Sequence, residues 1–188
     1  IKGLDVHIVG LDLKEQVIKD CNALAKKFGY TGLTFKLGDI NGYKSDMQVD
    51  MVMTLHACDV ATDYALYNAI IWKADYILSV PCCQHELNRQ ICSDELNGLM
   101  RFGIVKERVA ALMTDSIRGL MLETCGYKTD IMEFIDIAHS PKNLLIRAVR
   151  KNVSLEKRQR ALGDAEALCE EFHTEQTLMK MLKTDGVI

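Results

Sequence analysis

The sequence contains no apolar run that approaches the ~20 residues needed for a membrane-spanning helix. Its first residues do not combine a basic region, an apolar stretch and a small-residue cleavage site, so we expect no secretory signal there. Internal repeats and low-complexity segments are also absent. A chain of 188 residues with 48% hydrophobic and 26% charged residues is typical of a soluble domain with a sizeable core. We therefore expect no membrane partner.

The cysteines lack the spacing of a disulfide framework or of paired metal ligands. There are seven, an odd number, and no Cys-x-x-Cys occurs. This usage favours a reduced, cytoplasmic setting. Cys82 and Cys83 are adjacent, which is poor spacing for sharing one tetrahedral ion, so we predict no metal site.

The chain also lacks a strong charge of one sign. Its net charge of −3 excludes a polycation. Basic residues do cluster between Lys142 and Arg160. A solvated face is the favoured interpretation of this cluster, and an anion-facing patch is the alternative.

What the sequence does contain is a regular alternation of strands and helices. Short apolar runs at 5–12, 32–39, 49–56 and 75–82 predict four strands. Helical spacing follows the first of these at 13–28 and the third at 59–74, and 86–126 is typical of two helices. The third run is almost continuously apolar, as expected of a strand buried on both faces. Helical connections predict that all four strands are parallel neighbours in one sheet.

The rhythm changes near the end of the chain. Two strands, 130–136 and 143–150, are separated by a connection too short for a parallel crossover, so they are expected to be antiparallel. After Val153 the pattern is helical, with Ser154 as a helix cap and a break near His173. We therefore predict an α/β domain over 1–153 and a helical extension over 154–188.

Reactive residues gather where two of the predicted strands end. His56, Ala57 and Cys58 follow the third strand, and Cys82, Cys83 and His85 follow the fourth; in open α/β sheets, ligands bind at such carboxyl ends. The second group has three interpretations: a zinc site, a nucleophilic cysteine of lowered pKa, or a loop that shapes a substrate pocket. His56 is equally well interpreted as a base or as a half-buried structural histidine.

Acids end the first two predicted strands. Asp12 can accept hydrogen bonds from ribose hydroxyls, because a carboxylate takes two donors; a helix N-cap is the alternative. Asp39, followed by Ile40, can receive an adenine amino group while the apolar side chain packs on the ring; a turn beside Gly38 is the alternative.

These residues resemble a family of S-adenosylmethionine-dependent methyltransferases. In that family the fourth strand ends in Leu-His-x-Cys-x-x-Ala-Thr-Asp and the fifth in Cys-Cys; here the corresponding segments are 55–63 and 81–85. The segment 139–143 is also similar to the family's. The resemblance covers about residues 5–151. The family includes a eukaryotic tRNA ribose methyltransferase, relatives acting on ribosomal components and many uncharacterised bacterial members.

The resemblance implies a Rossmann-like methyltransferase sheet, mostly parallel with an antiparallel last strand, and S-adenosyl-L-methionine as cofactor. It implies that Asp12 holds the cofactor ribose and that Asp39 and Ile40 flank adenine. Residues 56–59 and 81–85 would line the methyl-transfer pocket, with His56 or His85 as base. RNA or a ribosomal component would be the acceptor, making RNA modification the expected role.

The sequence departs from this family in one respect. Family members place a first strand and a Gly-rich loop ahead of the strand that corresponds to 5–12, and neither is present here. We expect both to precede residue 1, and this chain alone to bind cofactor weakly and to be inactive. Two alternatives stay open. The amphipathic segment after Ser154 favours a non-enzymatic interaction module, and a nicotinamide-dependent oxidoreductase is less favoured because Gly-x-Gly-x-x-Gly is absent.

Overall fold

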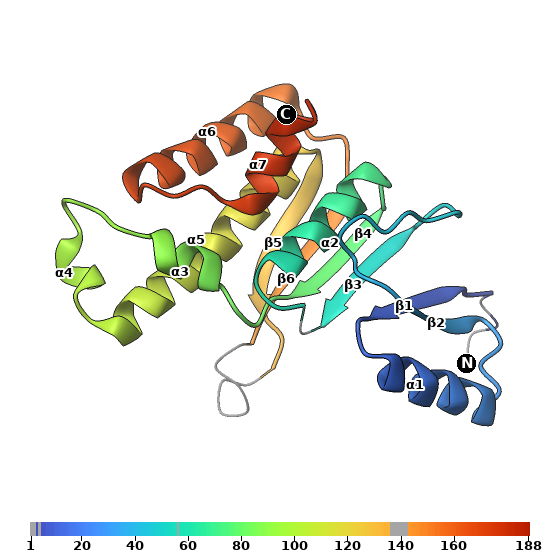
Figure 1. Cartoon of the computed structure of the whole chain (residues 1–188). Helices are drawn as coiled ribbons and strands as arrows, with labels where there is room; N and C mark the ends of the chain where they lie inside the picture. Colours follow the sequence, from blue (N-terminus) through green and yellow to red (C-terminus); the bar gives the residue numbers. More distant parts are fainter. Residues whose placement is uncertain (1–2, 4, 56, 136–142) are drawn as a thin grey trace. The chain divides into compact units, whose positions relative to one another are not determined.

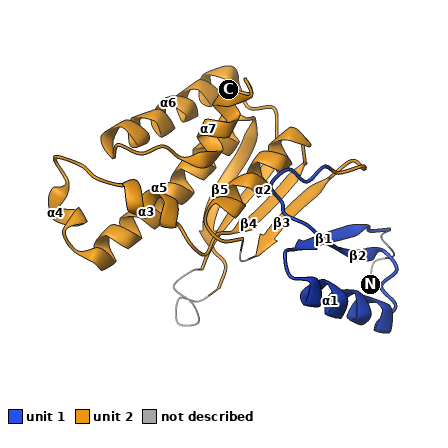
Figure 2. Cartoon of the chain, viewed as in Figure 1, with its two compact units in different colours: residues 1–44 blue, residues 45–188 orange. Residues whose placement is uncertain are grey.

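The computed structural model describes residues 3, 5–55, 57–135 and 143–188. These form two compact units, residues 1–44 and residues 45–188 (Figure 2). Each unit is described by itself. No helix in the described ranges is both long and apolar enough to cross a membrane.

The first unit is a single strand–helix–strand motif (Figure 1). Strands β1 (Ile8–Asp12) and β2 (Leu33–Leu37) pair in parallel, with Asp12 opposite Leu37. Helix α1 (Glu15–Lys27) connects them and is anchored by Asn22, whose side-chain amide donates to Phe35 O at 2.8 Å and accepts from Phe35 N at 2.9 Å. Gly29 follows the helix with φ of 73°, a conformation that glycine adopts without strain. The predicted parallel pair is confirmed.

The second unit contains a four-stranded mixed sheet in the order β3-β4-β6-β5. Strands β3 (Met51–Leu55) and β4 (Tyr76–Val80) are parallel, and β6 (Leu144–Arg150) runs antiparallel to both β4 and β5 (Tyr127–Glu133). The antiparallel last strand and the antiparallel β5–β6 pair are therefore confirmed, as is the α/β, Rossmann-like class.

The prediction of one continuous sheet was wrong, because the described strands pair as two separate sheets. Helices α1 and α2 (Val60–Ile71) each close a parallel pair, as a crossover requires. The segment between β2 and β3 contains no helix and imposes no such pairing.

Two further corrections concern the strands. Strand β5 begins at Tyr127, three residues earlier than predicted, because Gly126 (φ 92°) ends the preceding helix and the chain extends at once. Strand β3 is not buried on both faces: Val52 is buried, whereas Met51, Met53 and Leu55 are exposed.

Helices cover one face of the four-stranded sheet. The segment predicted as two helices contains three: α3 (His85–Gln90), α4 (Asn97–Met100) and α5 (Gly103–Thr124). Helices α2 and α5 contact the sheet, while α6 (Leu155–Glu171) packs on α5 and α7 (Thr177–Thr184) packs on α2 and α5 (Figure 1). Buried side chains from all of these layers form one core, among them Leu66, Ile77, Ile117, Ala165 and Leu178. The predicted cap is confirmed, since Ser154 Oγ accepts from Lys157 N.

Candidate functional site

Two loops meet at the carboxyl ends of β3 and β4. The strands are parallel and in register, with Leu55 opposite Val80, so the residues that follow them emerge side by side. The Cys58 Sγ atom lies 3.2 Å from Cys82 Sγ, which lies 3.7 Å from Cys83 Sγ. The expected convergence of the two loops is confirmed for these cysteines. His56 and the segment 136–142 lie outside the described residues, so the role expected for His56 stays a prediction.

A fully buried arginine lies beneath both loops. Arg118 on α5 donates from Nε and Nη2 to the two carboxylate oxygens of Asp63, at 2.9 and 2.7 Å. Its Nη1 donates to Asp115 Oδ1 at 3.0 Å, and Nη2 also donates to the backbone oxygen of Asp59 at 2.8 Å. Burial alone would lower the pKa of Arg118, but the two carboxylates outweigh that effect and raise the pKa. The guanidinium is therefore a permanent cation at this position.

Further hydrogen bonds tie the second loop to the same cation. Gln84 donates to Asp115 Oδ2 at 3.1 Å, and Asp59 Oδ1 accepts from Glu86 N at 2.9 Å. Asp59 therefore caps the start of α3, while its own helix, α2, receives no side-chain cap from it. Its φ of 54° is unusual for a residue other than glycine, and these bonds hold it there. Together they fix the relative position of the two cysteine loops.

The buried charges beneath the loops do not balance. One guanidinium faces two buried carboxylates, so neither Asp receives a whole counter-charge. Burial accordingly raises the pKa of Asp115 to about 6, although the neighbouring Arg118 acts in the opposite direction. Asp115 therefore gains a proton at a higher pH than an ordinary aspartate does.

The cysteine environment bears on the proposed nucleophile. Burial raises the pKa of Cys82 to about 12, and the hydrogen bonds with Cys58 and Cys83 act in the same direction. Cys82 is thus a thiol at neutral pH, whereas a nucleophilic cysteine works as the thiolate. The structure disfavours that interpretation for Cys82 in the metal-free protein.

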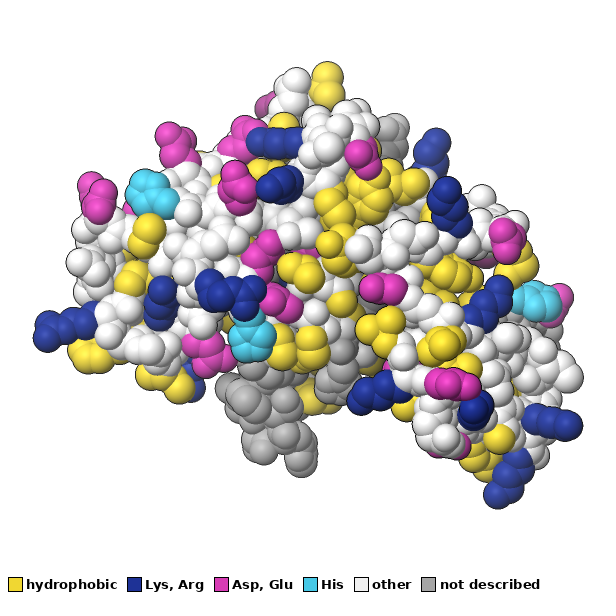
Figure 3. All heavy atoms as spheres, in the orientation of Figure 1, with side chains coloured by type: hydrophobic (Ala, Val, Ile, Leu, Met, Phe, Trp, Pro, Cys, Tyr) yellow, Lys and Arg dark blue, Asp and Glu magenta, His cyan; other side chains and the backbone are white. Residues whose placement is uncertain are grey.

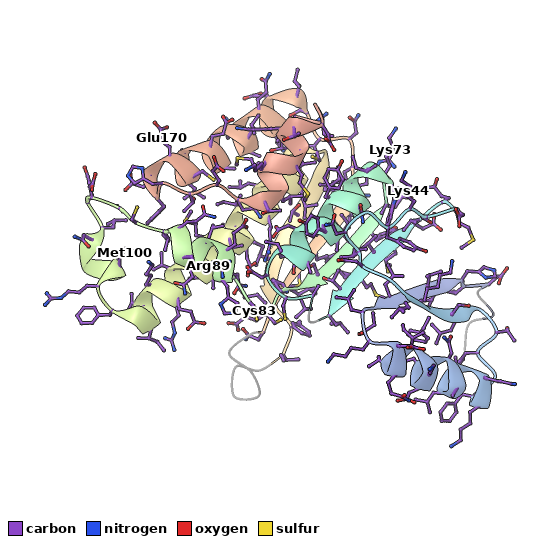
Figure 4. The ribbon with its side chains drawn as sticks, in the orientation of Figure 1. Lys44, Lys73, Cys83, Arg89, Met100 and Glu170 are labelled. Carbon is purple, nitrogen blue, oxygen red and sulfur yellow. The ribbon has the colours of Figure 1, made fainter. Side chains whose placement is uncertain are left out.

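A small cavity adjoins the second loop. It measures about 100 Å³ and is lined by Cys82, Cys83, Gln84, His85, Asn88 and Glu107. His85 is exposed at the first residue of α3. In Figure 4, Cys83 lies in the loop that leaves β4, close to the short helix that carries Arg89. The cavity therefore offers thiols, an imidazole and an amide to a ligand reaching this edge.

The acids of the first unit also converge. Gly38 N donates to Asp12 O at 3.1 Å, so the ends of β1 and β2 lie together. Asp12 Oδ1 accepts from Lys14 N at 2.8 Å, and Asp39 Oδ1 accepts from Asn41 N at 2.9 Å. Asp39 thus has the turn-forming role considered as its alternative. Asp12 forms a similar turn but is not the helix N-cap considered as its alternative, because the cap of α1 is Lys14. Each keeps a second carboxylate oxygen that can accept a hydroxyl or amino proton.

Sequence reasoning did not assign the charged network. Asp63 belongs to the quoted motif, but no role was given to it. The available signal was the pair Asp115 and Arg118, three residues apart on a mostly apolar helix, where opposite charges face the same side.

Comparison with known proteins gives one family match, which covers slightly less than half of the chain. A family model described as a methyltransferase domain matches residues 1–90. No curated protein matches the chain. The match supports methyl transfer as the class of activity, and methyltransferase domains generally imply S-adenosylmethionine.

Two solved structures are similar at a low level. The YcgJ protein from Bacillus subtilis has 9% identity and a TM-score of 0.42, covering 77% of this chain and 82% of its own. The PH0226 protein from Pyrococcus horikoshii has 13% identity and a TM-score of 0.39, covering 77% and 72%. Neither value adds to the functional assignment.

Proposed function

We propose that this chain is part of an enzyme that transfers a methyl group from S-adenosylmethionine to an acceptor. The observation that carries the proposal is the methyltransferase-domain match over residues 1–90. The matched range includes the two acid-terminated strands of the first unit and both cysteine loops of the second. When bound, this cofactor supplies an electrophilic methyl group on a sulfonium.

The first unit offers the second carboxylate oxygens of Asp12 and Asp39 as hydrogen-bond acceptors. These acceptors fit the hydroxyl and amino groups of an adenosine. Asp12 is assigned to the ribose hydroxyls, and Asp39 with Ile40 to the adenine ring. The convergence of β1 and β2 supports this assignment, because it brings both acids to one edge of the parallel pair.

The second unit offers the groups proposed for the acceptor and for methyl transfer. His56, Ala57 and Cys58 on one loop, and Cys82, Cys83 and His85 on the other, are assigned to contact with cofactor or acceptor. Their contribution is chiefly positional: the acceptor is held in line and water is excluded. Imidazole is the side chain most often used to accept a proton, so His85, exposed beside the cavity, is the described candidate base.

RNA is the acceptor that we propose, on the strength of the resemblance to methyltransferases of tRNA and ribosomal components. Acidic and basic side chains are interspersed over the face seen in Figure 3. This face therefore has no uniform positive field that would attract RNA. RNA recognition would depend on local contacts at the acceptor edge.

Cofactor binding by the full chain tests the proposal. Isothermal titration with S-adenosylmethionine should give binding that weakens by about one to two decades in Asp12→Ala, because a charge-assisted hydrogen bond is worth ~1.5–3 kcal/mol and a decade is ~1.4 kcal/mol. Asp20→Ala, an exposed acid on α1, is the matched control and should bind like wild type. Equal affinity in all three proteins would show that Asp12 forms only a turn.

The acceptor is tested separately. Methyl-labelled cofactor is incubated with the natural protein that contains this chain and with either purified RNA or RNA-free protein extract. Label in the RNA arm alone supports an RNA acceptor. Label in the protein arm alone contradicts it but leaves methyl transfer intact.

A further inference from the structure

Three cysteine sulfur atoms gather at the ends of β3 and β4. The Sγ atoms of Cys58, Cys82 and Cys83 all lie within 4.8 Å of one another. Four ligands at ~2.3 Å around a tetrahedral zinc place neighbouring sulfurs about 3.8 Å apart. The Cys82–Cys83 separation of 3.7 Å already has this value, and the Cys58–Cys82 separation of 3.2 Å is about 0.6 Å shorter. A small rotation of the exposed Cys58 side chain is enough to open that distance.

The scaffold beneath the cluster is rigid. Cys58 precedes Asp59, whose backbone oxygen is held by Arg118 and whose carboxylate is held by Glu86 N. Cys83 precedes Gln84, which is bonded to the same buried network through Asp115. Ligands on two separate loops are thus held in place without any metal, which reduces the ordering cost of binding one.

We propose that Cys58, Cys82 and Cys83 form a binding site for one thiophilic d¹⁰ cation, with Zn²⁺ as the expected ion. Thiolate sulfur is the ligand that selects such ions. No fourth His, Cys, Asp or Glu from the described ranges joins the group. As far as the described residues go, the fourth coordination position is left to water or to a ligand, as in zinc sites that act on a bound molecule.

Binding is balanced in charge and protons. Each coordinating thiol loses its proton to the solvent as its sulfur bonds the cation, so the three-thiolate site carries one net negative charge when Zn²⁺ is bound. Nothing is oxidised or reduced. The site does not depend on methyl transfer, and its test is independent of that activity.

The proposal reverses the expectation from sequence. That expectation depended on the adjacency of Cys82 and Cys83, which is poor for a shared ion, and on the absence of spaced ligand pairs such as Cys-x-x-Cys. The third sulfur comes from the neighbouring strand end, 24 residues away in sequence, and only the parallel register of β3 and β4 brings it there.

Cobalt titration of the reduced, metal-free full chain tests the site. We expect one equivalent of Co²⁺ to produce thiolate-to-cobalt charge-transfer absorption, and one equivalent of Zn²⁺ to abolish it. Cys58→Ser, Cys82→Ser and Cys83→Ser should each weaken binding by about 100-fold. Cys92→Ser is the matched control, because Cys92 is an exposed cysteine outside the cluster. It should bind like wild type.

Three results would overturn the proposal: no charge-transfer absorption, binding that survives replacement of all three cysteines, or weakening by Cys92→Ser alone. Counting thiols in protein purified without reductant adds an independent check. Loss of two thiols, mapped to a Cys58–Cys82 disulfide, would show an oxidation site in place of a metal site. Circular dichroism confirms that each variant is folded before its titration is interpreted.

Discussion

Replacing Arg118 with methionine should strongly destabilise the second unit. Methionine approximately preserves the volume of the buried stem but removes the cation from Asp63 and Asp115, which are themselves buried. Four hydrogen bonds from the guanidinium are lost with it. Removing one partner of a buried ion pair lowers the free energy of unfolding by ~3–5 kcal/mol, because the remaining buried charge is uncompensated. This is a large part of the ~5–15 kcal/mol that stabilises a typical domain.

Urea unfolding followed by circular dichroism measures this effect. The matched control is Arg160→Met, because Arg160 forms an exposed pair with Glu156 on α6 and such pairs are worth about 0.3–0.5 kcal/mol. Asp63→Asn in the Arg118→Met background should recover part of the loss by removing an unpaired charge. If Arg118→Met lowered the free energy of unfolding no more than Arg160→Met does, the argument that this cation holds the two loops would be wrong.

Two further outcomes follow from buried groups of the second unit. The folded-state pKa of Asp115, about 6, exceeds its ordinary value of 3.8, so the native state binds a proton more tightly than the unfolded state does. The stability gained from this proton is lost as pH rises from about 4 to about 6. Asp115→Asn should flatten this part of a plot of unfolding free energy against pH, and an unchanged slope would contradict the assignment. Tyr127→Phe should cost about 1 kcal/mol in urea unfolding, because the buried hydroxyl donates to Ala74 O at 2.9 Å, and a neutral result would mean that solvent satisfies this oxygen.

Local patterns predicted the individual elements well. The helical spacing at 13–28, the acids that follow the first two apolar runs, and the short link before β6 each depend on neighbouring residues. Structures set by local sequence are accessible from one sequence, and these predictions are confirmed at the level of element type and pairing direction.

What the sequence could not supply was the partner of each charged or reactive side chain. Arg118 meets Asp63 across 55 residues, and Cys58 meets Cys82 across 24. Such contacts depend on which strands are adjacent and in what register, a property of the whole unit. The same limit explains the single-sheet error: each run correctly predicted a strand, but no local feature showed that β2 and β3 do not pair.

Stability alone does not explain the buried network of Arg118, Asp63 and Asp115. A hydrophobic core residue in place of Arg118, with apolar partners in place of Asp63 and Asp115, would satisfy packing at lower desolvation cost. Such a core could not donate a hydrogen bond to the backbone oxygen of Asp59 or accept one from Gln84. Directional donors and acceptors of this kind are what fix the position of each loop. The charged network lies beneath the two loops that carry Cys58, Cys82, Cys83 and His85. Its desolvation cost is offset by a functional gain, because it holds both loops in one geometry before any ligand binds.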